Sequence, residues 1–445
     1  MASELTRRRF LAAASAAGTG LALGTGPVIA AGEEKPALLG GTPARKGPFP
    51  PWPVFDEKDE DALLKVLRTG RWYRGDGQYV ARFEAAYAER MGAKYCVATA
   101  SGSTALYTSL AALGVQAGDE VILPPYTFIA CVNVILALNA LPVFVDTDPE
   151  TFQIDPARIE PAVTDRTVAV MPVHIGGNVA DLDGVLVVAR RRNLAVVEDT
   201  CQSHLAEWKG RKAGTHGDTG CFSFQASKHL NAGEGGAILT NSEEVANQCY
   251  AVHNHGRPRT AGAGPACRCQ GVNFRMTEFQ GGLLLAQMTR LEEQARRREQ
   301  NARYLSGLLG GIPGIQPARM YGGCTRNAYH LYMFRYNSEA FAGLSRAAFL
   351  KALSAEGVPA SAGYTPLNKF PFIRQTLQSR GFQRLFSKER LALWEKQNEC
   401  PANDRLCTEG VWMSQNVLLA DRAEMDRIAG AVRKIRKYAP DLARA

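Results

Sequence analysis

The chain has 445 residues, of which 46% are apolar, and a formal net charge of +9. This length and composition fit a soluble globular protein of about two or three domains. The moderate positive balance fits an anionic ligand or simple solubility. Basic runs interleaved with aromatic residues do not occur, which disfavours a nucleic-acid-binding protein.

The first 31 residues have the pattern of an export signal. Three arginines, Arg7 to Arg9, precede an Ala-, Gly- and Leu-rich stretch with small residues for cleavage after Ala30 or Ala31. Twin-arginine signals carry this pattern. A membrane anchor is the alternative, although the apolar stretch is short for a span. We therefore expect a periplasmic or extracytoplasmic protein with no membrane span in its mature chain, or a cytoplasmic one if the signal is not used.

Ten cysteines are scattered along the chain. An exported protein can form disulfides, and Cys400 and Cys407 are the pair that we consider for one. The chain has no Cys-x-x-Cys spacing, so we expect no metal site.

Residues 32–56, rich in Gly and Pro, are expected to form an N-terminal arm. Apolar strands then alternate with helices, which predicts an α/β layer with a mostly parallel sheet in a large domain, residues 57–308. Residues 309–445 are expected to form a smaller C-terminal α+β domain. The expected strands include Cys96–Ala98, Glu120–Leu123, Val143–Val145, Val168–Met171, Ala195–Val197 and Cys221–Phe224. The expected helices are Glu57–Leu67, Val80–Met91, Ser103–Leu113, Phe128–Leu138, Val179–Arg192 and Met276–Leu308.

Two polar stretches follow predicted strands, at the carboxyl edge where parallel sheets bind ligands. Ser103 and Thr104 open a helix, where free amides and hydroxyls bind phosphate, although an ordinary N-cap would look the same. Asp199 directly follows a buried strand. Its carboxylate could hold a protonated ring nitrogen, or cap a helix.

A lysine stands in an unusual place within FSFQASKHLNAGEGG, residues 222–236. Lone lysines usually lie on surfaces, but a desolvated lysine such as Lys228 can attack a carbonyl. Ser223 could add a hydroxyl to a phosphate site, and Phe128 could stack on a flat ring. A phosphate cradle, a stacking ring, a ring-nitrogen acid and an aldehyde-trapping lysine are the groups that pyridoxal phosphate (PLP) requires.

The order and spacing of these residues resemble the DegT/StrS-type sugar aminotransferases, which have the aspartate aminotransferase fold, PLP fold type I. The resemblance runs from about Pro36 to the C-terminus. It rests on Glu198-Asp199, Gln202, the Phe-Ser-Phe-x-x-Ser-Lys stretch and Gly233-Glu234-Gly235-Gly236.

The resemblance implies a role for each matching residue, and a homodimer with shared active sites. Lys228 would bond to the cofactor and Asp199 would contact the pyridine nitrogen. Gln202 would lie near the ring hydroxyl, and Phe128 would stack on the ring. The phosphate would be held by Ser103, Thr104 and Ser223, and by Asn273 from a neighbouring subunit.

Two subfamilies share features with this chain. Gly40 to Arg45 and Trp52-Pro53 look like the scyllo-inosose aminotransferases. His255 to Arg259 and Cys400 to Leu419 also resemble the 3-amino-5-hydroxybenzoate synthases. Three positions depart from the family pattern: Thr200, Leu205 and His229.

The resemblance implies transfer of an amino group from glutamate or glutamine to a keto-sugar or keto-cyclitol. A cyclising enzyme of the hydroxybenzoate type and a non-catalytic PLP-binding sensor are the alternatives, whereas Lys228 disfavours a PLP sugar dehydratase. Because nucleotide sugars are scarce outside the cytoplasm, export favours a free inosose-type ketone or a cell-surface sugar. Five further residues could line the substrate pocket or be purely structural: His204, His255, Arg257, His330 and Arg335.

Overall fold

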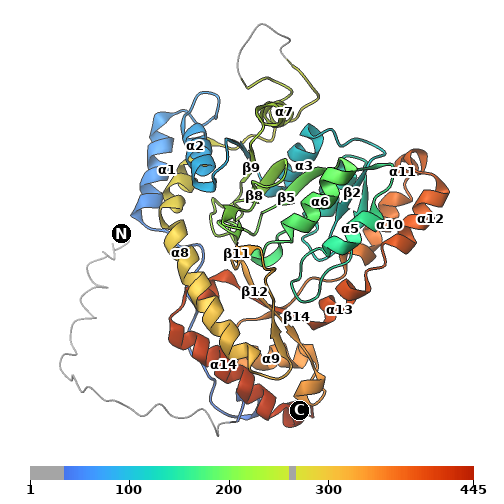
Figure 1. Ribbon diagram of the computed structural model, residues 1–445. Helices are drawn as coiled ribbons and strands as arrows, with labels where there is room; N and C mark the ends of the chain where they lie inside the picture. Colours follow the sequence, from blue (N-terminus) through green and yellow to red (C-terminus); the bar gives the residue numbers. More distant parts are fainter. Residues whose placement is uncertain (1–34, 260–266, 445) are drawn as a thin grey trace, which may run out of the picture. The chain divides into compact units, whose positions relative to one another are not determined.

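A computed structural model describes residues 35–259 and 267–444 of the chain (Figure 1). Residues 1–31, the predicted export signal, lie outside the described residues, so that prediction stays untested. Among the helices described, none is both long and apolar enough to cross a membrane.

A seven-stranded sheet forms the centre of the first core. Six strands point the same way, and β9 runs opposite to both of its neighbours, so the prediction of a mostly parallel sheet is confirmed. The strand order across the sheet is β1 (Tyr95–Thr99), β9 (Gly236–Thr240), β8 (Thr219–Ser223), β5 (Ala195–Asp199), β4 (Thr167–Val170), β2 (Glu120–Leu123) and β3 (Leu141–Phe144).

Helices cover both faces of this sheet because successive strand residues point to opposite sides. Val121 and Leu123 pack on one face, whereas Ile122 packs on the other. Both sides are therefore dry, which explains why the strands are apolar at nearly every position. The first face carries α3 (Gly102–Ala112), α4 (Ala130–Ala137) and α7 (Glu243–His253). The second carries α2 (Tyr79–Met91), α5 (Ile159–Ala162), α6 (Leu182–Arg192) and the first half of α8 (Glu278–Gly310).

A second core surrounds a four-stranded antiparallel sheet. Its order is β10 (Ile315–Pro317), β12 (Leu331–Tyr336), β14 (Gly410–Ser414) and β13 (Ser361–Ala362). The end of α8 packs on it together with α9 (Arg346–Ala355), α14 (Arg422–Lys437) and α15 (Ala439–Leu442). The first half of α8 belongs to the first core and its end to the second, so one 33-residue helix joins the two cores. Helix α8 also contacts α1 (Glu57–Thr69).

Four short helices of the C-terminal part contribute side chains to the apolar cluster of the first core. Ile373, Phe382, Trp394 and Leu406 all belong to the apolar cluster of the seven-stranded sheet. They lie on α10 (Pro371–Leu377), α11 (Arg380–Leu385), α12 (Lys388–Gln397) and α13 (Pro401–Glu409). The predicted domain boundary at residue 308 stays a prediction, but packing does not follow chain order here. A three-stranded sheet completes the described strands: β11 (Cys324–Arg326), β6 (Glu207–Trp208) and β7 (Arg211–Lys212).

The structure contradicts the Cys400–Cys407 disulfide. Both cysteines are buried and free. Cys400 is the N-cap of α13 and Cys407 lies within the same helix, and seven positions along a helix separate two Cα atoms by about 10 Å. A disulfide spans at most about 7 Å between Cα atoms.

Candidate active site

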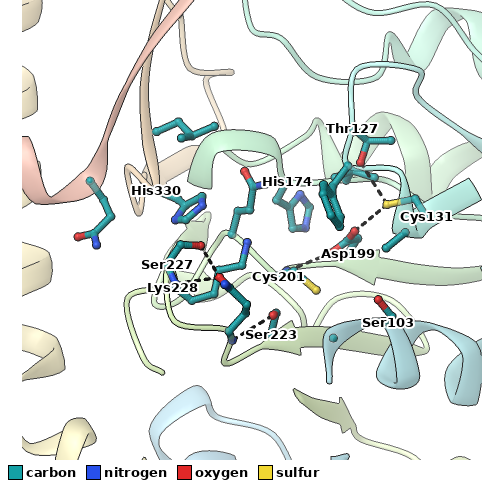
Figure 2. Close-up of a pocket in the computed structure, with 18 of the residues that line it drawn as sticks. Ser103, Thr127, Cys131, His174, Asp199, Cys201, Ser223, Ser227, Lys228 and His330 are labelled. Atoms are coloured by element: carbon teal, nitrogen blue, oxygen red, sulfur yellow. Dashed lines mark hydrogen bonds between the residues drawn. The ribbon is translucent and has the colours of Figure 1, made fainter. Parts of the chain in front are cut away.

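A cavity of about 720 Å³ lies where β5 and β8 end and α3 begins. Figure 2 shows Asp199, Ser223 and Lys228 around it, together with Ser103 on the helix that approaches from below. Six of the eight predicted cofactor-binding residues line it: Ser103, Phe128, Asp199, Gln202, Ser223 and Lys228.

The N-terminus of α3 forms one wall of the cavity. Ser101 caps the helix: its Oγ accepts from the Thr104 N–H at 3.1 Å, and its own N–H donates to Thr104 Oγ1 at 2.9 Å. Gly102 brings the first turn against β8, because a Cβ there would lie 2.7 Å from Ser223 Cβ. Unpaired amides of such a turn favour phosphate. Thr104 is not among the lining residues described and its hydroxyl serves the cap, so its phosphate contact stays a prediction.

Asp199 ends β5 and is 6% exposed. Its Oδ1 accepts from the Cys201 N–H at 3.0 Å, and its Oδ2 accepts from the Cys131 thiol at 2.9 Å. Both donors are neutral, so the negative charge of Asp199 is left to attract a positively charged ligand atom in the cavity.

Lys228 lies in the turn that follows β8 and is half-buried. Its N–H donates to the Gln225 carbonyl at 2.8 Å. Burial lowers the pKa of its amine, although the nearby Cys201 and Asp199 side chains oppose that shift. A larger fraction of the amine is therefore uncharged than on a solvated lysine, which suits a nucleophile or a base.

Glycine is required in the loop that closes this turn. The Gly233 carbonyl accepts from the Ala226 N–H at 2.9 Å. Gly233 has φ of 80° and Gly235 has φ of 150°, and the left-handed region is costly for other residues.

Gln202 and Phe128 line the same cavity as Asp199. Gln202 is held at both ends: its Oε1 accepts from the Gly176 N–H at 2.7 Å, and its Nε2 donates to the Tyr364 hydroxyl at 3.2 Å. Phe128 is 57% exposed and so offers a free ring face.

Of the five residues proposed for the substrate pocket, His330 lines the cavity. Burial and the nearby Lys228 amine lower its pKa well below the usual range, so its imidazole is neutral. His204 is a structural hydrogen bonder: its ring contacts the Tyr87 hydroxyl at 3.1 Å and the Ser223 carbonyl at 3.0 Å. Burial lowers the pKa of His204 to about 3.

The remaining predicted residues lie elsewhere in the described chain. Arg335 contacts Glu409 at 3.2 Å and lines a separate small cavity. His255 and Arg257 are exposed on the loop after α7 and do not line the main cavity of the described chain. Asn273 is also exposed and outside this cavity, so its contact with a neighbouring subunit's cofactor stays a prediction.

Comparison with known proteins identifies the family. The model of the DegT/DnrJ/EryC1/StrS aminotransferase family matches residues 53–433. The chain belongs to this family. The predicted fold, PLP fold type I, and the predicted PLP-dependent transaminase class are thereby confirmed.

Two similar relatives and one solved structure refine the picture. The chain is 38% identical over 431 residues to an L-glutamine:2-deoxy-scyllo-inosose aminotransferase of Streptoalloteichus tenebrarius, covering 91% of this chain and 98% of the relative. It is 36% identical over 413 residues to an L-glutamine:scyllo-inosose aminotransferase of Streptomyces griseus, covering 90% and 97%. The crystal structure of 3-amino-5-hydroxybenzoic acid synthase matches with a TM-score of 0.79 and 32% identity, over 90% of this chain and all of that one.

Several cavity residues of this aminotransferase were not predicted from the sequence. Trp52 comes from the arm, and its Nε1 donates to the Ala226 carbonyl at 3.0 Å, beside the Lys228 turn. Gln415 and Asn416 are polar residues that follow the apolar run of β14, but β14 belongs to the antiparallel sheet, to which the carboxyl-edge argument used for Asp199 does not apply. Tyr364 carries no comparable signal.

A buried cation lies behind this wall of the cavity. Arg298 on α8 is fully buried, and its Nε donates to Gln415 Oε1 at 2.7 Å. Its Cζ lies 5.0 Å from the centre of the Trp52 ring. Among the described residues no acid pairs with Arg298, and burial lowers its pKa to about 9. Its positive potential therefore extends into the cavity.

Proposed function

We propose that this aminotransferase moves an amino group from glutamine, or from glutamate, to a keto-cyclitol of the inosose type. The observation that carries the proposal is one cavity that joins a lysine of lowered pKa, a buried carboxylate and a helix N-terminus. The relatives named above act, by their names, with L-glutamine on scyllo-inososes, which supports this donor and acceptor.

The residues present fit PLP. The glycine at 102 lets the first turn of α3 lie against β8, so that Ser103 and Ser223 line one cavity where a phosphate could meet both hydroxyls. Asp199, whose hydrogen-bond donors are neutral, suits a protonated pyridine nitrogen, and the exposed Phe128 suits the ring. PLP, when bound, supplies an electron sink next to the substrate carbon that carries the amine.

The protein's own groups have separate tasks in the reaction. In its uncharged form the Lys228 amine could take the proton from the donor carbon that carries the amino group, and its lowered pKa favours that form. Gln202 is fixed at both ends and can orient a ring hydroxyl without moving. Trp52 and Trp412 cover apolar parts of the cavity wall and limit entry of water.

We further propose that the enzyme is a homodimer with shared sites and is exported by the twin-arginine route. Exposed apolar side chains on and after α1 suit a surface that a second copy covers; they are Leu63, Leu64, Leu67, Trp72 and Tyr73. Arg7 to Arg9 and the apolar stretch that follows support export. A free inosose-type ketone is then the expected acceptor.

The test is a two-stage assay on signal-less protein loaded with PLP. Glutamine should bleach the visible band of the bound cofactor, and a free scyllo-inosose should restore it. Lys228→Ala should abolish both changes, while Lys351→Ala, at an exposed lysine of α9, should not.

Three outcomes would count against the proposal. A band that no amino donor perturbs would favour the PLP-binding sensor. Turnover with nucleotide-linked keto-sugars alone would contradict the free acceptor. Formation of an aromatic amine from a cyclic precursor would favour the hydroxybenzoate-type chemistry of the solved neighbour.

A further inference from the structure

The carboxylate assigned to the cofactor ring has a buried neighbour to which the proposed function gives no task. Cys131 lies on α4, is 1% exposed and lines the cavity. Its thiol donates to Asp199 Oδ2 at 2.9 Å, and its Sγ lies 3.1 Å from Thr127 Oγ1. Figure 2 shows Thr127, Cys131 and Asp199 in a row joined by these two contacts.

The direction of this relay follows from which atoms can donate. An ionised carboxylate only accepts, so the thiol hydrogen lies between Cys131 and Asp199. The sulfur then has only lone pairs left for Thr127, whose O–H must donate to it. Burial and the charge of Asp199 raise the pKa of Cys131, so the thiol keeps its hydrogen and the relay keeps this one polarity.

We propose that Cys131, oriented by Thr127, is a positioning residue that directs the Asp199 carboxylate toward the ring nitrogen of the cofactor and so keeps the shared proton on that nitrogen. The inference rests on the proposed function only in requiring that PLP occupies the cavity. A hydrogen bond donated to a carboxylate stabilises its charged form, so the thiol favours the arrangement in which the carboxylate is charged and the proton lies on the ring nitrogen. The ring nitrogen then retains its proton and the ring its full positive charge.

Other titratable groups also face Asp199 and are the same in every variant below. In the described chain, electrostatic contact with Asp199 is made by Lys228, Cys201, Cys221 and Tyr364. The Cys201 thiol lies 3.7 Å from the Cys221 carbonyl and also hydrogen-bonds to Asp199, whose Oδ1 accepts from the Cys201 N–H at 3.0 Å.

The experiment is a pH titration of the visible absorption of the PLP-loaded enzyme, without any substrate, in Cys131→Ala and Cys131→Ser. A ring with full positive charge binds protons less tightly at atoms conjugated with it. Without the thiol donor, Cys131→Ala should therefore show a higher pH midpoint for the change in visible absorption, by about half a pKa unit. This variant should also release PLP several-fold faster. The hydroxyl of Cys131→Ser is a stronger donor than a thiol and should move the midpoint in the opposite direction.

Two further variants separate this role from packing. Cys249 is a fully buried thiol of the same apolar cluster without contact to Asp199, so Cys249→Ala leaves an equal void and should not move the midpoint. Thr127→Val should shift it as Cys131→Ala does, by less. The inference fails if both Cys131 variants shift the midpoint the same way or not at all, and Thr127→Val decides alone if Cys131→Ala does not fold. A protein that binds no PLP refutes the proposed function instead.

Discussion

Gly102→Ala is expected to damage cofactor binding although it adds a single methyl group. The new Cβ would lie 2.7 Å from Ser223 Cβ and 3.0 Å from Cys201 Sγ, whereas ordinary contact begins at 3.4 Å. Ser223 is fixed in β8 and cannot give way as a flexible side chain would. Overpacking of this kind costs about 1–3 kcal/mol. If that cost falls on the closed phosphate cradle, PLP binds about 5- to 150-fold more weakly.

The assay is a PLP titration of the apoenzyme followed by absorbance, with a thermal melt of each variant. Gly307→Ala is the matched control, because Gly307 is exposed on α8 and a Cβ there meets nothing within 4 Å. That change should raise stability by about 0.5–1 kcal/mol and leave the Kd for PLP unaltered. Unchanged PLP affinity in Gly102→Ala, with the control behaving as stated, would refute the role assigned to this helix N-terminus.

Three further outcomes are expected. Glu198→Gln should cost roughly 3–5 kcal/mol in urea unfolding at pH 7, because the buried carboxylate accepts from the His174 ring and from three backbone N–H groups. Burial alone would raise the pKa of the Glu198 carboxyl, but its hydrogen bonds outweigh burial and lower that pKa below the usual 4.5. The contribution of the carboxylate to folding stability is therefore complete above pH 4.5 and is lost as the pH falls further. Glu198→Gln should lack this acid dependence. Arg298→Met should raise the KM for glutamine about tenfold and leave the KM for a neutral acceptor unchanged. Glutamine carries a carboxylate that the positive charge of Arg298 attracts, whereas a neutral acceptor carries none. Equal increases in the two KM values would contradict this prediction. Reductant should leave the melting temperature unchanged, because Cys400 and Cys407 are free. A lower melting temperature in reductant would instead support the disulfide that the structure contradicts.

Much of the first core could be predicted because its strands are buried on both faces. Such strands are continuous apolar runs, and the predicted Glu120–Leu123 coincides with β2. Helix starts were less accurate where a cap decided them: α6 begins at Leu182, not Val179, because Asp181 Oδ1 accepts from the Gly184 N–H at 3.1 Å. Strand β9 was not predicted. It follows directly on the glycine-rich loop, whose composition indicates a turn and not a sheet.

The cavity residues on the seven-stranded sheet were more predictable than those from the C-terminal part for a physical reason. Asp199 ends β5, Ser223 ends β8 and Lys228 lies in the turn after β8, and the carboxyl ends of parallel strands meet at one edge of a sheet whatever the loops do. His330 and Gln415 reach the same cavity from β12 and β14 of another sheet, and their place depends on how the two cores pack. No local pattern encodes that packing.

Thr104 shows how local competition limits such assignments. Thr104 lies one residue beyond Ser103, on the first turn of α3. A phosphate ligand and a helix cap would both form a hydrogen bond with a hydroxyl at this position. The backbone N–H of Ser101 lies 2.9 Å away on the same chain and is always present, whereas a ligand must bind first. The cap therefore takes the hydroxyl, and Ser103, with no such partner in the described chain, faces the cavity. At a helix N-terminus, the residue to assign to a ligand is the one that the capping box does not use.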